Sequence, residues 1–300
     1  MAKKKSKRAN LPISSPYLVP SDGSWKIAKA AHEPPDDAPS GKKGKRENKT
    51  VLEEAVKEIY ELQRMFYAHD RYSLLLVFQA MDAAGKDGTI RAVMTGINPA
   101  GCQVQSFKRP STEELDHDFL WRCATRMPER GRFGIFNRSH YEEVLVVRVH
   151  PEILQSQNLP HIPDDIWEQR YESIRNFEKH AADNGTVIVK FFLNVSKKEQ
   201  KARLLERIDD ERKNWKFEAG DLDVRDRWDD YMKVYQKALN ATSRSWAPWY
   251  AIPADDKPFM RATVATIVRD TLKALPLRYP KLDDAQKARL AEHRARLEAS

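Results

Sequence analysis

The chain has 300 residues, 41% of them hydrophobic, and a formal net charge of +8, which suit one large α/β domain with tails better than two small domains. No run approaches the 18 apolar residues of a membrane span, and the first residues lack the apolar core of a secretory signal. We therefore expect a cytoplasmic protein without membrane partners, and its two cysteines, Cys102 and Cys123, show no spacing that indicates a disulfide framework or a zinc site.

Most of the net charge lies at the start of the chain. Residues 1–49 hold twelve Lys and Arg against five Asp and Glu, which accounts for seven of the eight net charges. Because residues 1–48 are rich in Lys, Pro, Ser and Gly, we predict a largely disordered or surface-draped basic segment. A basic tail can also bind nucleic acid through salt-sensitive contacts. A nucleic-acid-binding module is therefore the non-enzyme alternative, although we do not expect nucleic acid as a partner.

Strands and helices are predicted to alternate from residue 49 to about 280. Apolar runs and period-3.6 patterns place helices and strands at residues 50–68, 74–80, 101–107, 112–127, 133–137, 164–184, 186–193, 197–213, 226–243, 249–252 and 259–275. Residues 281–300 form a C-terminal tail or a surface helix. The alternation predicts a mainly parallel sheet with helices on both faces, which is a three-layer α/β/α fold with ligands at the carboxyl ends of the strands.

A small-residue loop joins the strand at 74–78 to an amphipathic helix, and we place a phosphate site there. Free backbone N–H groups and the helix dipole attract phosphate at such a loop, and Lys86 supplies a mobile charge. The loop departs from the P-loop pattern, because Ala80 replaces its first glycine and Asp87 its hydroxyl residue. The predicted nucleotide- or phosphate-binding residues of the loop are Ala84, Gly85, Lys86, Gly88 and Thr89. In the alternative, Gly85 and Gly88 only make a sharp turn.

Carboxylates are expected to bind the metal ion in place of the missing hydroxyl. Asp82 and Asp87 belong to the loop, and Mg²⁺ prefers one or two carboxylates with water and substrate phosphates. Asn137 is at the carboxyl end of the strand at 133–137, at the position that holds an acid in P-loop kinases, so we count it as a third candidate ligand. Mg²⁺ is the expected cofactor, with Mn²⁺ as a substitute. Asp82 could instead cap the turn in a purely structural role.

The residue after Asn137 is a candidate catalytic group. Arg138 lies at the carboxyl end of its strand, where the phosphate loop also lies, and its guanidinium could bind a transferring phosphoryl group. The alternative is an ion pair between Arg138 and a core carboxylate. With Asp82 and Lys86, Arg138 completes the predicted catalytic set.

Further basic residues follow the second and third strands, namely Lys108, Arg109, Arg122, Arg126 and Arg148. Arg122 and Arg126 are expected to be neighbours on one face of the helix at 112–127, where they could bind successive anionic groups. Each could equally be a solvated surface charge, or pair with the acids of the same helix.

The helix at 197–213 and the residues after it are read as a lid, at about 196–220. Arg203 and Arg207 lie four residues apart beside its apolar stripe, and Lys216 follows between two aromatic residues. Lid arginines in phosphotransferases close over phosphates and exclude water. Alternatively, the segment is an ordinary amphipathic helix.

Three motifs together resemble the second family of polyphosphate kinases, and further short matches extend the resemblance over residues 50–275. The motifs are Met81-Asp82-Ala83-Ala84-Gly85-Lys86-Asp87-Gly88-Thr89-Ile90-Arg91, Ser106-Phe107-Lys108-Arg109-Pro110 and Phe136-Asn137-Arg138-Ser139-His140-Tyr141-Glu142-Glu143-Val144-Leu145-Val146. The resemblance implies a P-loop-kinase-like fold with a helical lid, and Mg²⁺-dependent phosphoryl transfer between inorganic polyphosphate and nucleotides. It also implies that Asp82, Lys86, Asp87 and Arg138 match functional residues of the family.

Within that family, residues 139–146 look like the subgroup that phosphorylates both AMP and ADP. Nucleoside mono- and diphosphates are then the expected partners of polyphosphate, and the resemblance also suggests a homo-oligomer. Lys108, Arg109, Arg122, Arg126 and Arg148 become the hypothetical groove for the polyphosphate chain, since paired arginines suit a repeating anion. The rival enzyme is an ATP-dependent nucleoside monophosphate or small-molecule kinase that uses the same loop.

Overall fold

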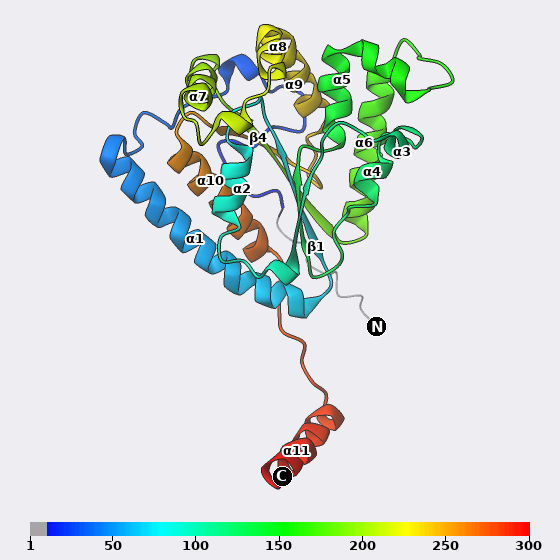
Figure 1. Ribbon diagram of the computed structural model, residues 1–300. Helices are drawn as coiled ribbons and strands as arrows, with labels where there is room; N and C mark the ends of the chain where they lie inside the picture. Colours follow the sequence, from blue (N-terminus) through cyan, green and yellow to red (C-terminus); the bar gives the residue numbers. More distant parts are fainter. Residues whose placement is uncertain (1–10) are drawn as a thin grey trace.

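A five-stranded parallel sheet forms the centre of the protein, as a computed structural model that describes residues 11–300 shows (Figure 1). The strands lie in the order β2-β3-β1-β4-β5. Their bounds are β1 Ser73–Gln79, β2 Cys102–Ser106, β3 Phe133–Asn137, β4 Thr186–Asn194 and β5 Trp249–Pro253. Helices cover both faces of the sheet, which confirms the predicted three-layer α/β/α class.

The two innermost strands are apolar runs because both of their faces are covered. Every residue of β1 is buried, and β4 is buried from its second residue to its last. The register places Phe78 of β1 beside Asn137 of β3 on one side and Phe191 of β4 on the other. The loop after β1 and the residues after β3 therefore emerge at the same edge of the sheet.

The helices divide into two layers, which Figure 1 shows on either side of the sheet. The longest helix, α1 (Gly41–His69), packs on α10 (Lys257–Ala274), and α10 packs on α2 (Lys86–Val93). On the other face, α6 (Ile166–Asp183) packs on β4 and on α9 (Trp228–Thr242). The shorter elements are η1 Ile27–Lys29, η2 Pro99–Gly101, α3 Thr112–Leu115, α4 Trp121–Ala124, η3 His140–Val144, α5 Val146–Val149, η4 Pro151–Gln157, α7 Lys197–Asp209, η5 Asn214–Lys216 and α8 Gly220–Asp226.

The predicted helix at 112–127 is wrong, because the chain forms two short helical segments there. Ser111 and Glu114 cap α3, and the Asp118 carboxylate accepts a hydrogen bond from the backbone N–H of Leu120 at 2.9 Å. Such local side-chain bonds compete with a continuous helix. Since α4 ends at Ala124, Arg122 and Arg126 do not share a helical face as expected.

The described part of the N-terminal segment runs along the surface and packs on the sheet edge. Leu18 forms an antiparallel bridge with Tyr250 of β5, and Val19 is only 2% exposed. The first helix begins at Gly41, so the expected domain boundary at residue 49 falls inside α1. The basic cluster at residues 3–8 lies outside the described residues.

The last helix, α11 (Asp284–Glu298), stands apart from the sheet at the bottom of Figure 1. None of its residues, all of them in the described part of the chain, is buried. Within residues 11–300, no helix combines the length and apolar character that a membrane crossing requires.

Deletion of residues 281–300 should leave the stability of the domain unchanged. We expect the free energy of unfolding to change by less than about 0.5 kcal/mol, because an exposed helix removes little apolar surface from water. Urea unfolding of the full and shortened chains measures the change. The matched variant is Trp25→Ala in the N-terminal segment, where the indole packs edge-on against Phe192 with ring centroids 6.4 Å apart, and this change should destabilise the protein. Equal losses in both variants would contradict the expectation.

Candidate active site

The loop between β1 and α2 has the backbone shape of an anion-binding site. Ala83 and Gly85 both have positive φ, at 61° and 105°, and Gly85 caps the start of α2. The Thr89 N–H donates to the Gly85 carbonyl, which closes the first helical turn. The N–H groups of the residues before Thr89 therefore point out of the helix end, where the helix dipole is positive.

Lys86 lies across this loop. Its Nζ donates to the Ala80 carbonyl at 2.9 Å, so the ammonium group stays above the loop rather than extending into solvent. Burial lowers the pKa of Lys86, and the nearby Arg138 lowers it further, whereas Asp82 opposes the shift. The neighbouring carboxylates therefore do not fully offset the cost of burying the Lys86 charge. An anionic ligand at the loop would stabilise that charge.

Arg138 reaches the loop from the end of β3, as the sequence predicted for neighbouring strand ends. One guanidinium nitrogen, Nη2, lies 2.8 Å from Asp82 Oδ1, and the other, Nη1, lies 3.4 Å from Glu142 Oε2. Glu142 is the main cause of the raised pKa of Arg138, and Asp82 contributes. Arg138 has φ of 60°, a conformation that a non-glycine residue rarely adopts and that often occurs at functional sites.

The candidate metal ligands come from two segments: Asp82 and Asp87 from the loop after β1 and the start of α2, and Asn137 from the end of β3. The Asn137 side-chain amide donates to Asp87 Oδ1 at 2.6 Å, and Asp82 Oδ1 accepts from Arg138. Within residues 11–300 the second oxygen of each carboxylate has no hydrogen-bond partner, and no group of three or more His, Cys, Asp and Glu side chains converges. Two free carboxylate oxygens fit Mg²⁺, which takes few protein ligands and completes its shell with water and phosphate.

Arg203 is bound to the loop from behind. Its Nη1 donates to the Ala84 carbonyl at 2.7 Å, and its Nη2 donates to the Ala254 carbonyl at 2.6 Å. The side chain is 5% exposed. Arg203 thus joins the loop after β1 to the turn after β5, and these contacts suit a residue that holds the loop more than one that closes over a substrate.

The other two cationic residues of the predicted lid have different partners. Arg207 Nη1 lies 3.0 Å from Asp221 Oδ2 and also binds the Lys216 carbonyl. The Lys216 ammonium lies over the ring of Trp215, at 5.0 Å from its centroid, and Trp215 is 77% exposed. Arg203, Arg207 and Lys216 therefore do not converge on one point.

The five residues predicted to bind polyphosphate differ in their exposure and in their contacts with other parts of the protein. Lys108 and Arg109 are exposed after β2, and Arg126 is exposed after α4. Arg122 donates to the Lys108 carbonyl at 2.8 Å and lies 3.4 Å from Glu114. Arg148 donates to the Tyr171 hydroxyl at 3.0 Å and stacks near Trp167.

Three residues near the loop were not anticipated. Glu142 pairs with Arg138, and Gln200 donates to the Asp82 carbonyl at 3.1 Å. The Arg261 guanidinium lies 3.0 Å from where a Cβ on Gly88 would stand. The pairing of Glu142 with Arg138 could have been predicted, because Glu142 lies four residues after Arg138 in the motif at 136–146. Gln200 and Arg261 approach from α7 and α10, and no local pattern marks them.

Comparison with known proteins gives one family and several relatives. The family model described as polyphosphate kinase 2 (PPK2) matches residues 42–279. The ADP-polyphosphate phosphotransferase of Rhodopseudomonas palustris is 54% identical over 250 residues, which cover 82% of this chain and 86% of the relative. The AMP/ADP-polyphosphate phosphotransferase of Meiothermus ruber is 44% identical over 269 residues, which cover 90% of this chain and 96% of the relative.

The fold is also similar to that of a solved structure. The crystal structure of polyphosphate kinase 2 from Arthrobacter aurescens TC1 superposes with a TM-score of 0.80 at 38% sequence identity. The match covers 92% of this chain and 95% of that chain.

Replacement of Arg203 should destabilise the phosphate loop and the whole domain. In Arg203→Met the buried carbonyls of Ala84 and Ala254 lose their donors, and we expect the free energy of unfolding to fall by about 2–4 kcal/mol. Arg203→Lys keeps the charge but not the fork of donors, so it should restore only part of the loss. Urea denaturation measures both.

The control for this prediction is Lys201→Met, an exposed position on the same helix. It should change the free energy of unfolding by less than about 0.5 kcal/mol. If Arg203→Met were as mild as the control, the guanidinium would not be what joins the loop to the turn after β5.

Proposed function

The chain belongs to the polyphosphate kinase 2 family, and from this premise we propose that it transfers phosphoryl groups between inorganic polyphosphate and nucleotides at the loop between β1 and α2. The observation that carries the proposal is the meeting of Lys86, Asp82 and Arg138 at one edge of the sheet. Phosphoryl transfer needs alignment and charge neutralisation more than covalent chemistry, and this set provides two cations and a carboxylate.

Direct in-line transfer is the mechanism that this arrangement supports. The first turn of α2 and Lys86 would bind the phosphate that is transferred, and Arg138 would stabilise the charge that spreads over its oxygens in the transition state. His140 is the histidine closest in sequence to these residues, and its side chain is fully buried in the described structure. A buried imidazole cannot reach a substrate phosphate, which argues against a phosphohistidine intermediate.

Kinases of this kind use a divalent metal ion, and we propose Mg²⁺, with Mn²⁺ as a substitute. Asp82 and Asp87 would hold it through their free oxygens, with Asn137 beside Asp87. When bound, the metal neutralises charge on the substrate phosphates. Asn137 carries no charge, so the two loop carboxylates and the substrate would balance more of the metal's charge.

AMP and ADP are the proposed nucleotide acceptors. The relatives from R. palustris and M. ruber are named for ADP and for AMP/ADP, and residues 139–146 resemble the subgroup that uses both. We propose that Lys108, Arg109 and Arg126, which are exposed, bind the polyphosphate chain, with Arg122 and Arg148 at its border. Arg207 and Lys216 are proposed nucleotide contacts from the lid. A cytoplasmic homo-oligomer remains our expectation.

A donor assay tests the proposed function. The purified full chain with Mg²⁺ and long-chain polyphosphate should convert AMP to ADP and ADP to ATP when each nucleotide is supplied separately. Chromatography of the nucleotides measures the products, and omission of polyphosphate is the control. Turnover with ATP as donor to another acceptor, but none with polyphosphate, would instead support the small-molecule kinase.

Asp82→Asn should abolish most of the activity without unfolding the protein. The change removes one charge next to Arg138 and the proposed metal, so we expect kcat to fall by about 10²–10³-fold and the Mg²⁺ concentration for half-maximal rate to rise. Steady-state kinetics at several Mg²⁺ concentrations measures both effects, and the melting temperature reports the fold. A near-normal kcat would show that the role of Asp82 is misassigned.

A further inference from the structure

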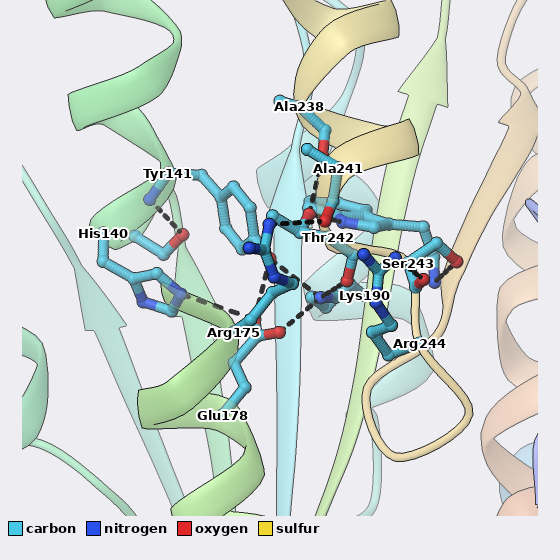
Figure 2. A network of polar contacts seen from close by, with 12 residues as sticks. His140, Tyr141, Arg175, Glu178, Lys190, Ala238, Ala241, Thr242, Ser243 and Arg244 are labelled. Atoms are coloured by element: carbon cyan, nitrogen blue, oxygen red, sulfur yellow. Dashed lines mark hydrogen bonds and ion pairs between the residues drawn. The ribbon is translucent and has the colours of Figure 1, made fainter. Parts of the chain in front are cut away.

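A buried polar cluster lies between the sheet and α6 (Figure 2), and one of its residues, Tyr141, follows Arg138 by three positions. Lys190 is in the middle of β4, where it pairs with Val77 of β1 and Trp249 of β5. Glu178 comes from α6 and Tyr141 from η3. The side chains of Lys190 and Glu178 are 0% and 1% exposed, so the ion pair between them has no contact with solvent.

Every donor of the Lys190 ammonium group has an acceptor in this cluster. Nζ donates to Glu178 Oε2 at 2.6 Å, to the Tyr141 hydroxyl at 2.8 Å and to the Thr242 carbonyl at 3.0 Å. The Tyr141 hydroxyl in turn donates to Glu178 Oε1 at 2.8 Å. His140 Nε2 lies 3.5 Å from the same oxygen. Burial lowers the pKa of Lys190 to about 8, and the ion pair with Glu178 opposes that shift.

Stability alone does not account for such a cluster in a sheet of apolar side chains. Removing two charges from water costs several kcal/mol per ion, and well-packed apolar replacements of buried ion pairs are often neutral or stabilising. A polar network whose partners are all satisfied does fix the position of its members. Within the network of Lys190, Glu178 and Tyr141, the member closest in sequence to the candidate active site is Tyr141, three residues after Arg138.

The 3-10 helix η3 is fixed on both sides of Glu142. Tyr141 binds Glu178 and Lys190, and Glu143 binds Arg170 of α6 with 2.5 Å between Oε2 and Nη1. Tyr141 and Glu143 thus point to α6, whereas the Glu142 carboxylate between them points to Arg138. The position of the carboxylate that pairs with Arg138 therefore depends on two buried contacts of its neighbours.

We propose that Tyr141, Glu178 and Lys190 are positioning residues that fix the direction of the Arg138 guanidinium through Glu142. This inference rests on the proposed function, in which Arg138 contacts the transferred phosphoryl group. Arg138 has an uncommon backbone conformation and a 40% exposed side chain, so it needs an outside constraint to hold one orientation. Asp82 contacts one of its terminal nitrogens and Glu142 the other.

A double-mutant cycle between Tyr141→Phe and Arg138→Ala tests the proposal. Tyr141→Phe removes only the hydroxyl, and kcat should fall about tenfold, because small displacements of catalytic groups carry such costs, while the KM values for polyphosphate and nucleotide change less than about twofold. In the Arg138→Ala background the same change should have no further effect on kcat. Independent, multiplicative effects would overturn the proposal, since a general structural defect acts whether or not Arg138 is present.

A second variant separates positioning from stability. The triple replacement Tyr141→Phe, Glu178→Leu and Lys190→Met removes the ion pair and the hydroxyl together, so that no charge is left buried alone. We expect a melting temperature equal to or above that of the wild type, with kcat reduced about as much as in Tyr141→Phe. A triple variant with wild-type kcat would also overturn the proposal.

The matched control is Ser73→Ala. Ser73 is buried on β1 at the opposite end of the sheet, and its hydroxyl binds Thr186 of β4 at 3.0 Å, far along the strands from Arg138. It should leave kcat within about twofold of the wild type in both backgrounds. If Arg138→Ala itself kept the wild-type kcat, the proposed role of Arg138 would fail and the positioning proposal with it. If Arg138→Ala lowered kcat but showed no coupling to Tyr141→Phe, only the positioning role of Tyr141, Glu178 and Lys190 would fail.

Discussion

The site depends on the ion pair between Asp82 and Arg138, which joins the loop after β1 to the end of β3. The pair forms because the register of the parallel strands places Phe78 beside Asn137, so that the next residues of both strands leave the sheet together. A shift of the register by one position would displace one strand end relative to the other by about 3.3 Å, more than the 2.8 Å between the paired atoms. The geometry of the site is thus a consequence of how the apolar strands pack.

Around this pair, polar contacts hold the cations in place. Lys86 is drawn to a backbone carbonyl of its own loop, and Arg203 binds the loop from behind. The cations that would meet phosphate are therefore positioned before a substrate arrives, which reduces the reorganisation that binding and transfer require. The network around Lys190 is also fully hydrogen-bonded, and it lies in the core between the sheet and α6.

Much of this arrangement follows from local sequence. The apolar run at 74–78, the glycines of the loop and the strand at 133–137 each have a pattern that reports structure, and the parallel fold then brings Asp82, Lys86 and Arg138 to one edge. Arg203 was also a candidate, but as a lid residue. Its carbonyl partners come from positions more than fifty residues distant in either direction, and no local pattern encodes such contacts.

The basic residues after β2 show a second reason why sequence patterns do not predict all of the structure. Arg122 and Arg126 were placed on one helix from their spacing, but Asp118 and the cap at Ser111 divide that segment into two. Side-chain bonds of this kind depend on which rotamers the surroundings allow, and apolar periodicity does not report them. Glu178 and Lys190 were missed for a related reason, because a buried ion pair is invisible until the two elements that carry it are packed together.

The separation of α11 from the sheet has a practical meaning. The carboxyl ends of the strands face one way in Figure 1, and the last helix lies at the other end of the molecule. A surface, a fusion partner or an affinity resin attached through the final residues would be held away from the phosphate loop. The protein could then be immobilised at its C-terminus for nucleotide regeneration with the entrance to the loop left open.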